Sequence, residues 1–264
     1  MRSIQANWEL LRALVSRELK SRYKGSALGV LWSLLTPMFM AVIYAFFFRL
    51  LSGRAANTPS IIVGVFAWQY TAVSVQQGMG CVTSNGNLVK KVSFARTILP
   101  VSTTVAAGID YLISLVVQLG VVGFFLFQNG EAWSAKFLFL PLIFIHHSIF
   151  NLALAFLLGA MNVYFRDTRH VVGVLLSAFF FLSPAMYDLS FLERFASEMS
   201  PWITQLYTLN PLAGIFTAYR WAFLPSADFT PTIWMWTGMS FPFVLVIMGW
   251  FVYKRAQRNF ADFI

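Results

Sequence analysis

The sequence predicts an all-α integral membrane protein with six transmembrane helices. Apolar residues make up 58% of the 264 residues and charged residues only 11%, against about 45–50% and about 25% in soluble globular chains. The apolar residues gather into stretches of about 20, the length of a membrane-spanning helix. A soluble fold of this length leaves too much of its chain facing water to hide them. The composition therefore excludes a soluble enzyme, a disordered chain and a disulfide scaffold.

The first 28 residues are predicted to form a cytoplasmic amphipathic interface helix. Over residues 4–24, apolar side chains recur at helical spacing opposite basic and polar ones; they are Ile4, Trp8, Leu11, Val15 and Leu19. A basic amphipathic helix just before a span suits the cytoplasmic membrane surface. It also suits a docking surface for a cytoplasmic partner, and the two interpretations are compatible.

Residues 29–264 are predicted to form one transmembrane domain. Its spans are expected at about 29–51, 61–83, 101–127, 137–161, 171–187 and 232–253. The second contains three glutamines and the fifth is short. Because unpaired polar groups are costly in lipid, we expect these two spans to face other helices or a polar cavity.

Charge distribution predicts the orientation. With six spans, both termini and the segments 84–100 and 162–170 lie on one side, and they hold 14 of the 19 Lys and Arg residues. Lys and Arg collect on the cytoplasmic side of a membrane, so both termini are predicted to be cytoplasmic. Topology and anionic headgroups then explain the net charge of +9 without nucleic acid.

The cytoplasmic segment 85–100 is unusually apolar for a loop. It opens with turn residues and ends at Pro100, which is well placed to start the next helix. A short surface helix with basic residues beside it is expected here. A positive-inside loop is the simpler interpretation, but exposed apolar residues favour contact with a partner.

The external segment 188–231 is predicted to contain short interfacial or re-entrant helices, since none of its apolar stretches is long enough to cross and return. Such helices are typical of a gate, here assigned to Leu192, Phe195 and Trp202. An aromatic belt at the membrane surface is the competing interpretation.

Catalytic and metal-binding patterns are largely missing. The sequence has no Gly-Lys dipeptide and hence no Walker A loop for ATP. Cys81 is the single cysteine, and His146 and His147 are expected to be interhelical hydrogen-bond partners. Asp110 is the only acid in a confident span, so it should face a partner or a polar patch near the cytoplasmic mouth. Proton-driven transport is disfavoured because a relay usually needs several such acids.

Aromatic residues make up 17% of the chain, and most are expected in lipid packing and interfacial belts. Some are candidates for a pore wall on which sugar rings stack, namely Tyr44, Phe47, Trp68 and Phe180.

Four motifs in order carry a family resemblance. Residues 18–37 (ELKSRYKGSALGVLWSLLTP) look like an interface helix running into a first span, and 87–100 (NLVKKVSFARTILP) like a coupling helix with Ala95 where many members have proline. The segment 165–167 (FRD) follows, and 209–211 (LNP) precedes Tyr219 and Arg220. The whole chain thus resembles the type-2 ABC transporter permeases that export cell-surface polysaccharides, the Wzm, KpsM and TagG group.

The resemblance implies a non-enzymatic permease of the bacterial cytoplasmic (inner) membrane. It implies a homodimer joined by two copies of a cytoplasmic ATP-binding subunit, which holds ATP and Mg while this chain binds no cofactor or metal. The substrate would be a glycan on undecaprenyl diphosphate, with O-antigen favoured. Capsule or teichoic acid exporters and drug or lipid type-2 exporters are the alternatives, although the short 52–60 stretch leaves no room for the larger external domain that many of the latter carry. A membrane-embedded glycosyl- or acyltransferase is the alternative from a different class.

The resemblance also directs the site predictions. Contact with the ATPase is expected at Leu88, Val89, Lys90, Lys91, Phe94 and Arg96. The anionic diphosphate needs cations at the cytoplasmic membrane edge, and these are expected to be Arg17, Arg22 and Lys24.

Overall fold

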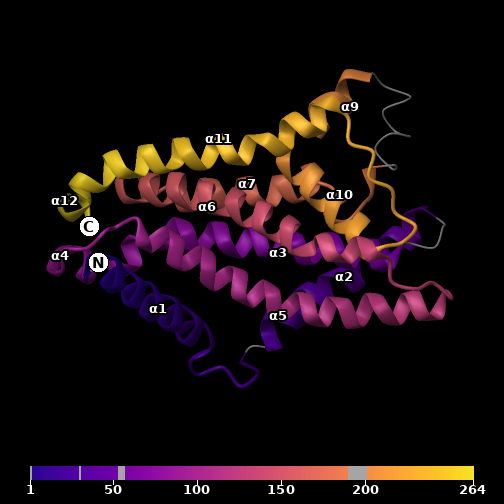
Figure 1. Cartoon of the computed structure of the whole chain (residues 1–264), viewed down its shortest axis with the longest axis horizontal. Coiled ribbons are helices and arrows are strands. Elements are labelled where there is room, and N and C mark those ends of the chain that lie inside the picture. Colours follow the sequence, from indigo (N-terminus) through magenta and orange to yellow (C-terminus); the bar gives the residue numbers. More distant parts are fainter. Residues whose placement is uncertain (1, 30, 53–56, 190–200) are drawn as a thin grey trace.

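The computed structural model describes residues 2–29, 31–52, 57–189 and 201–264, and their regular elements are all helical (Figure 1). The α-helices are α1 (Arg2–Tyr23), α2 (Leu31–Ser52), α3 (Thr58–Gly80), α4 (Gly86–Lys91), α5 (Ile98–Gln128), α6 (Leu140–Tyr164), α7 (Thr168–Leu182), α9 (Pro201–Thr208), α10 (Pro211–Phe223), α11 (Ile233–Ala256) and α12 (Phe260–Phe263). Short 3-10 turns cover Thr83–Asn85, Ala135–Phe139 and Gln257–Asn259. The all-α fold is confirmed, with a helix at each predicted span and over most of the predicted interface segment.

Three helical segments of the described chain are long and apolar enough to cross a membrane: Ile98–Gln128, Ala135–Tyr164 and Ile233–Phe263. Shorter apolar helices cover Leu31–Phe47 and Thr168–Leu182. The 23 residues of α3 occupy the predicted second span and include its polar glutamines. The structure thus confirms several apolar helices of membrane-spanning length, and the number of spans stays a prediction.

Helix α3 lies in the middle of the bundle, in contact with α2, α5, α6 and α10. Small residues bring α3 and α6 together, because a Cβ at Gly78 would lie 2.5 Å from Cβ of Ala155 and one at Gly159 would lie 2.9 Å from the Gly78 carbonyl oxygen. Small residues at a crossing are typical of packed membrane helices. The prediction that the second span faces other helices is therefore confirmed.

Helix α7 differs from the prediction for the fifth span. It runs from Thr168 to Leu182 rather than 171–187, and within the described chain it buries only Thr168, Val172 and Phe180. Its other side chains are partly or fully exposed, Val174 at 71%. The expectation that this short span faces other helices or a polar cavity on most sides is therefore not met within the chain. Helix α7 lies on the outside of the bundle and contacts mainly α3 and α6.

The two termini lie at the same end of the bundle, beside α4 and α12, and α9 lies at the opposite end (Figure 1). Helices α9 and α10 have 8 and 13 residues, too few to cross a membrane. Asn210 starts α10, since its side chain accepts a hydrogen bond from the Leu212 amide and Pro211 follows at the first helical position. Short helices in the segment 188–231 are thus confirmed.

Candidate functional site

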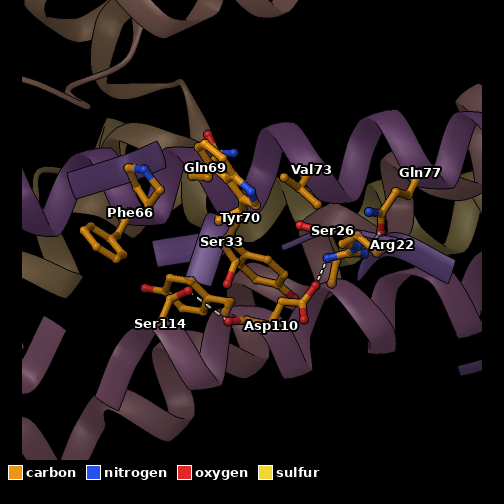
Figure 2. A pocket seen from close by; sticks show the side chains of 14 residues that line it. Arg22, Ser26, Ser33, Phe66, Gln69, Tyr70, Val73, Gln77, Asp110 and Ser114 are labelled. Atoms are coloured by element: carbon orange, nitrogen blue, oxygen red, sulfur yellow. Dashed lines mark hydrogen bonds and ion pairs between the residues drawn. The ribbon is translucent and has the colours of Figure 1, made fainter. Parts of the chain in front are cut away.

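A cavity of about 350 Å³ lies where the end of α1 meets α2, α3 and α5 (Figure 2). Its polar wall includes Gln69 and Gln77 from α3 and Asp110 and Ser114 from α5. Aromatic rings form much of the rest: Trp32, Phe66, Tyr70 and Tyr111. The glutamines that made the second span look unusual therefore face this cavity, except Gln76, which is exposed on the outside of the same helix.

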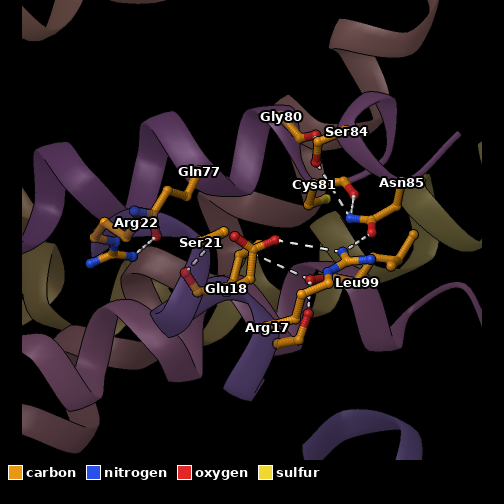
Figure 3. Close-up of polar contacts among 12 residues, drawn as sticks. Arg17, Glu18, Ser21, Arg22, Gln77, Gly80, Cys81, Ser84, Asn85 and Leu99 are labelled. Atoms are coloured by element: carbon orange, nitrogen blue, oxygen red, sulfur yellow. Dashed lines mark hydrogen bonds and ion pairs between the residues drawn. The ribbon is translucent and has the colours of Figure 1, made fainter. Parts of the chain in front are cut away.

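An ion pair closes one side of the cavity. The Arg22 guanidinium pairs with the Asp110 carboxylate (Figure 2) and donates a hydrogen bond to Oε1 of Gln77 (Figure 3). The Asp110 side chain is only 8% exposed, so the pair offsets the cost of burying its charge. The prediction that Asp110 has a partner is confirmed, and its place near a cytoplasmic mouth stays a prediction. The partner is Arg22, which we had expected to attract the carrier diphosphate instead.

The cations predicted to attract a diphosphate do not form one group. Arg17 donates a hydrogen bond to Oδ1 of Asn85 and lies 4.0 Å from Glu18 (Figure 3). A shallow recess of about 570 Å³ on the surface of α1 and the loop after it is lined by Arg17, Lys20 and Lys24, whereas Arg22 lines the cavity instead. Lys20 belongs to this cluster of three cations, which we call the basic recess. In the sequence, Lys20 follows Arg17 by three residues and precedes Lys24 by four, which is the spacing of residues on one helix face.

The predicted coupling segment is only partly helical. Helix α4 ends at Lys91, Val92 is extended, and α5 already begins at Ile98, with Pro100 inside its first turn. The expected helix over about 85–100 is thus shorter in the structure. Of the predicted contact residues, Val89 is buried in the bundle, Lys90 and Lys91 are exposed, and the others are intermediate, namely Leu88, Phe94 and Arg96.

The end of the chain supports this segment from the inside. The Lys90 ammonium donates to the backbone oxygen of Ile264, and Arg96 donates to the backbone oxygen of Gln257. The Tyr253 hydroxyl donates to the Arg96 carbonyl at 3.0 Å. Residues 92–96 with Gln257 and Arg258 border a recess of about 280 Å³. The segment is therefore held at both of its ends, with exposed residues between them.

The four aromatic residues predicted to line a pore fall into two groups in the structure. The ring centroid of Phe180 lies 5.2 Å from that of Tyr44 and 5.5 Å from that of Trp68, so three of the four residues meet. Phe180 and Trp68 are buried at 7% and 8% exposure. Phe47 is 52% exposed and its neighbouring ring is Phe46. Within the chain, the three rings pack against one another, and Phe47 lies apart from them.

At the opposite end, Arg220 forms a buried polar cluster that sequence reasoning missed. It pairs with Asp188 at 3.0 Å and donates to Oγ of Ser60 at 2.8 Å and to the Ala185 carbonyl at 3.1 Å. The cluster joins α10 to the start of α3 and to the chain after α7. The signal in the sequence that could have revealed this cluster is a single arginine, Arg220, within an apolar stretch. Of the predicted gate residues, Trp202 is 61% exposed on α9, and Leu192 and Phe195 lie outside the described residues.

The structure confirms the prediction that His146 and His147 form hydrogen bonds between helices. Nε2 of His147 lies 2.7 Å from Oγ1 of Thr71 on α3, and Nε2 of His146 lies 2.8 Å from the Met239 carbonyl on α11. Each therefore links α6 to a neighbouring helix. Cys81 is buried, and the described residues contain no group of His, Cys, Asp and Glu arranged to hold a metal.

An all-helical bundle with apolar helices of membrane length is typical of a multi-pass membrane protein. The family model of the ABC-2 type transporter matches residues 9–224. The chain is 29% identical over 267 residues to an O-antigen export system permease protein RfbA from Klebsiella pneumoniae, which covers 97% of this chain and 95% of the relative. It is 30% identical over 266 residues to the protein of the same name from Myxococcus xanthus, with the same coverage. The chain belongs to the ABC-2 type transporter family.

Proposed function

We propose that the chain is the transmembrane subunit of an ATP-driven exporter that moves an undecaprenyl-diphosphate-linked polysaccharide, O-antigen in the first instance, across the bacterial cytoplasmic membrane. The observation that carries this proposal is the likeness, over 97% of the chain, to O-antigen export permeases. The apolar helices and the polar cavity support it. Capsule and teichoic acid carriers are the alternative substrates within the same family.

The energy would come from a separate subunit. Two copies of this chain, each with six spans and cytoplasmic termini, would join two ATP-binding subunits that hold ATP and Mg. The sequence itself has no Walker A loop. The segment 86–96 supports this division of labour, because it presents Lys90, Lys91 and Val92 to solvent at the end of the bundle where both termini lie.

The basic recess is the proposed first contact of the carrier diphosphate. Its three cations, Arg17, Lys20 and Lys24, lie on one surface, and charge-assisted hydrogen bonds to phosphate oxygens are among the strongest that proteins make. Arg22 takes no direct part, because Asp110 already neutralises it. Our proposed set therefore contains Lys20 in place of Arg22.

The function is tested by searching the neighbouring reading frames for an ATPase with Walker motifs, purifying the chain with it and measuring ATP-dependent export in vesicles. We expect a stable complex that moves lipid-linked O-antigen, with capsular and teichoic acid carriers as comparison substrates. Purified chain that binds no ATPase, or that moves or modifies a glycan unaided, would overturn the proposal. Preferred export of another carrier would reassign the substrate.

The basic recess is tested by the double variant Lys20→Ala, Lys24→Ala. We expect the KM for lipid-linked glycan to rise about thirtyfold, because each of the two lost charge-assisted contacts contributes on the order of 1 kcal/mol. Arg12→Ala removes a cation from the same helix outside the recess and serves as the matched control. Equal KM values for the double variant and the control would remove the recess from the transport path.

A further inference from the structure

The cavity differs in charge from the basic recess. Arg22 and Asp110 are its charged lining residues, and they pair with each other. An anion entering the cavity would gain attraction from Arg22 but would face repulsion from Asp110 at the same place. The cavity therefore favours an uncharged polar ligand over a phosphate.

Hydrogen-bonding groups line one wall of the cavity. Gln69 and Gln77 lie about two helical turns apart on α3, and both line the cavity (Figure 2). Gln77 uses its carbonyl oxygen to accept from Arg22, and this leaves its amide donors outside that contact. No hydrogen bond to the Gln69 side chain is found within the described residues. An amide carries both donors and acceptors, the combination that a ligand rich in hydroxyl groups requires.

Aromatic rings supply the complementary apolar surface. Trp32 on α2 lines the cavity and is 52% exposed, and Phe66 and Tyr70 on α3 line it from another side. A few placed polar groups among aromatic walls are typical of small-ligand sites, which begin at about 300 Å³. At about 350 Å³ the cavity has room for a small ligand such as a single sugar unit, and too little for a lipid chain.

We propose that this cavity binds one sugar unit of the exported glycan, with Gln69 and Gln77 bonding its hydroxyl groups and Trp32 stacking against its ring. This inference rests on the proposed function and adds a specificity site to it. The cavity and the basic recess share the end of α1, since Arg22 and Ser26 line the first and Lys24 the second.

Binding is tested by cysteine protection in the purified complex with its ATPase. Ser33→Cys places a thiol in the cavity wall, and Gln128→Cys places one at the exposed far end of α5 as the matched control. The native Cys81 is 1% exposed and unreactive by burial. The probes are the free monosaccharides that make up the exported glycan, each compared with mannitol at equal concentration, and the rate of methanethiosulfonate labelling is measured.

We expect at least one monosaccharide to slow labelling of Ser33→Cys about threefold at twice its Kd, with mannitol inactive and Gln128→Cys unaffected by either. Labelling of Ser33→Cys that no monosaccharide slows would overturn the proposal. So would a Ser33→Cys thiol that stays unreactive while Gln128→Cys reacts, because the cavity would then be closed to solutes.

Specificity is tested by Gln69→Leu and Gln77→Leu, with Gln76→Leu as the matched control on the outer face of the same helix. We expect the KM for lipid-linked glycan to rise about fivefold in the first two variants with kcat unchanged, and wild-type values for the control. A wild-type KM in both cavity variants would overturn the proposed sugar site without contradicting the proposed export function. Absence of export by the wild-type complex would instead reject the proposed function. If a glutamine variant does not assemble, the cysteine measurement still decides.

Discussion

Two Arg–Asp pairs, at different places in the bundle, differ in their surroundings. The side chains of Arg22 and Asp110 are 21% and 8% exposed and border an open cavity. Those of Arg220 and Asp188 are 5% and 37% exposed. Arg220 donates hydrogen bonds to three further groups, namely the carbonyl and hydroxyl of Ser60 and the carbonyl of Ala185. A Cβ at Gly64 would lie 2.0 Å from the Ala185 oxygen and 2.3 Å from Nη2 of Arg220. The first pair therefore borders a cavity, whereas Arg220 of the second pair is closely packed.

The difference shows how one pair of residue types serves two purposes. A buried arginine with several partners and no free volume fixes the elements that it joins, since any shift leaves polar groups unpaired. An arginine beside a cavity can exchange its partner for water or ligand at lower cost. We therefore expect Arg220 to govern stability and Arg22 to govern the shape of the cavity.

The largest effect is expected for Arg220→Met. Loss of the cation leaves Ser60 and Ala185 without their donor, so we expect a cost of about 3–5 kcal/mol and an apparent Tm in detergent about 10 °C lower. Arg166→Met changes an exposed arginine and should leave Tm unchanged. A shift for Arg220→Met as small as that of the control would mean that the cluster holds nothing together.

A smaller effect is expected for Gly64→Ala. The added methyl group meets a backbone oxygen, which cannot move aside as a flexible side chain does, so we expect a cost of about 1–3 kcal/mol. The control is Gly120→Ala on α5, where a Cβ meets nothing within 4 Å and higher helix propensity favours alanine by about 1 kcal/mol. Thermal unfolding should therefore move in opposite directions in the two variants. The same direction in both would refute close packing at Gly64.

The smallest effect on stability is expected at the cavity. In a double-mutant cycle of Arg22→Gln and Asp110→Asn, we expect a coupling energy on the order of 1 kcal/mol, because the partly exposed Arg22 can turn to solvent. Thermal unfolding of the four proteins measures it. A coupling as large as the cost of Arg220→Met would erase the contrast between the two pairs.

Much of the fold followed from the sequence, and the reasons are physical. Apolar stretches placed the long helices within a few residues, and the glutamines marked α3 as a helix with protein on several sides. The partners of Asp110 and Arg220 did not follow, since they lie on distant parts of the chain and only packing brings them together. Phe47 was grouped with Tyr44 because an all-apolar helix has no polar face to show which side is buried. The boundary of α4 was missed because the extended Val92 has no turn signal before it.

The support of α4 by the end of the chain has a mechanical consequence. Lys90 rests on Ile264, and Arg96 is bonded to Gln257 and Tyr253, so displacing this segment displaces the last turn of α11 as well as α5, which follows directly. Helices α5 and α11 would then tilt together. A force applied to α4 would thus be transmitted to α5 and α11, both of which contact α6.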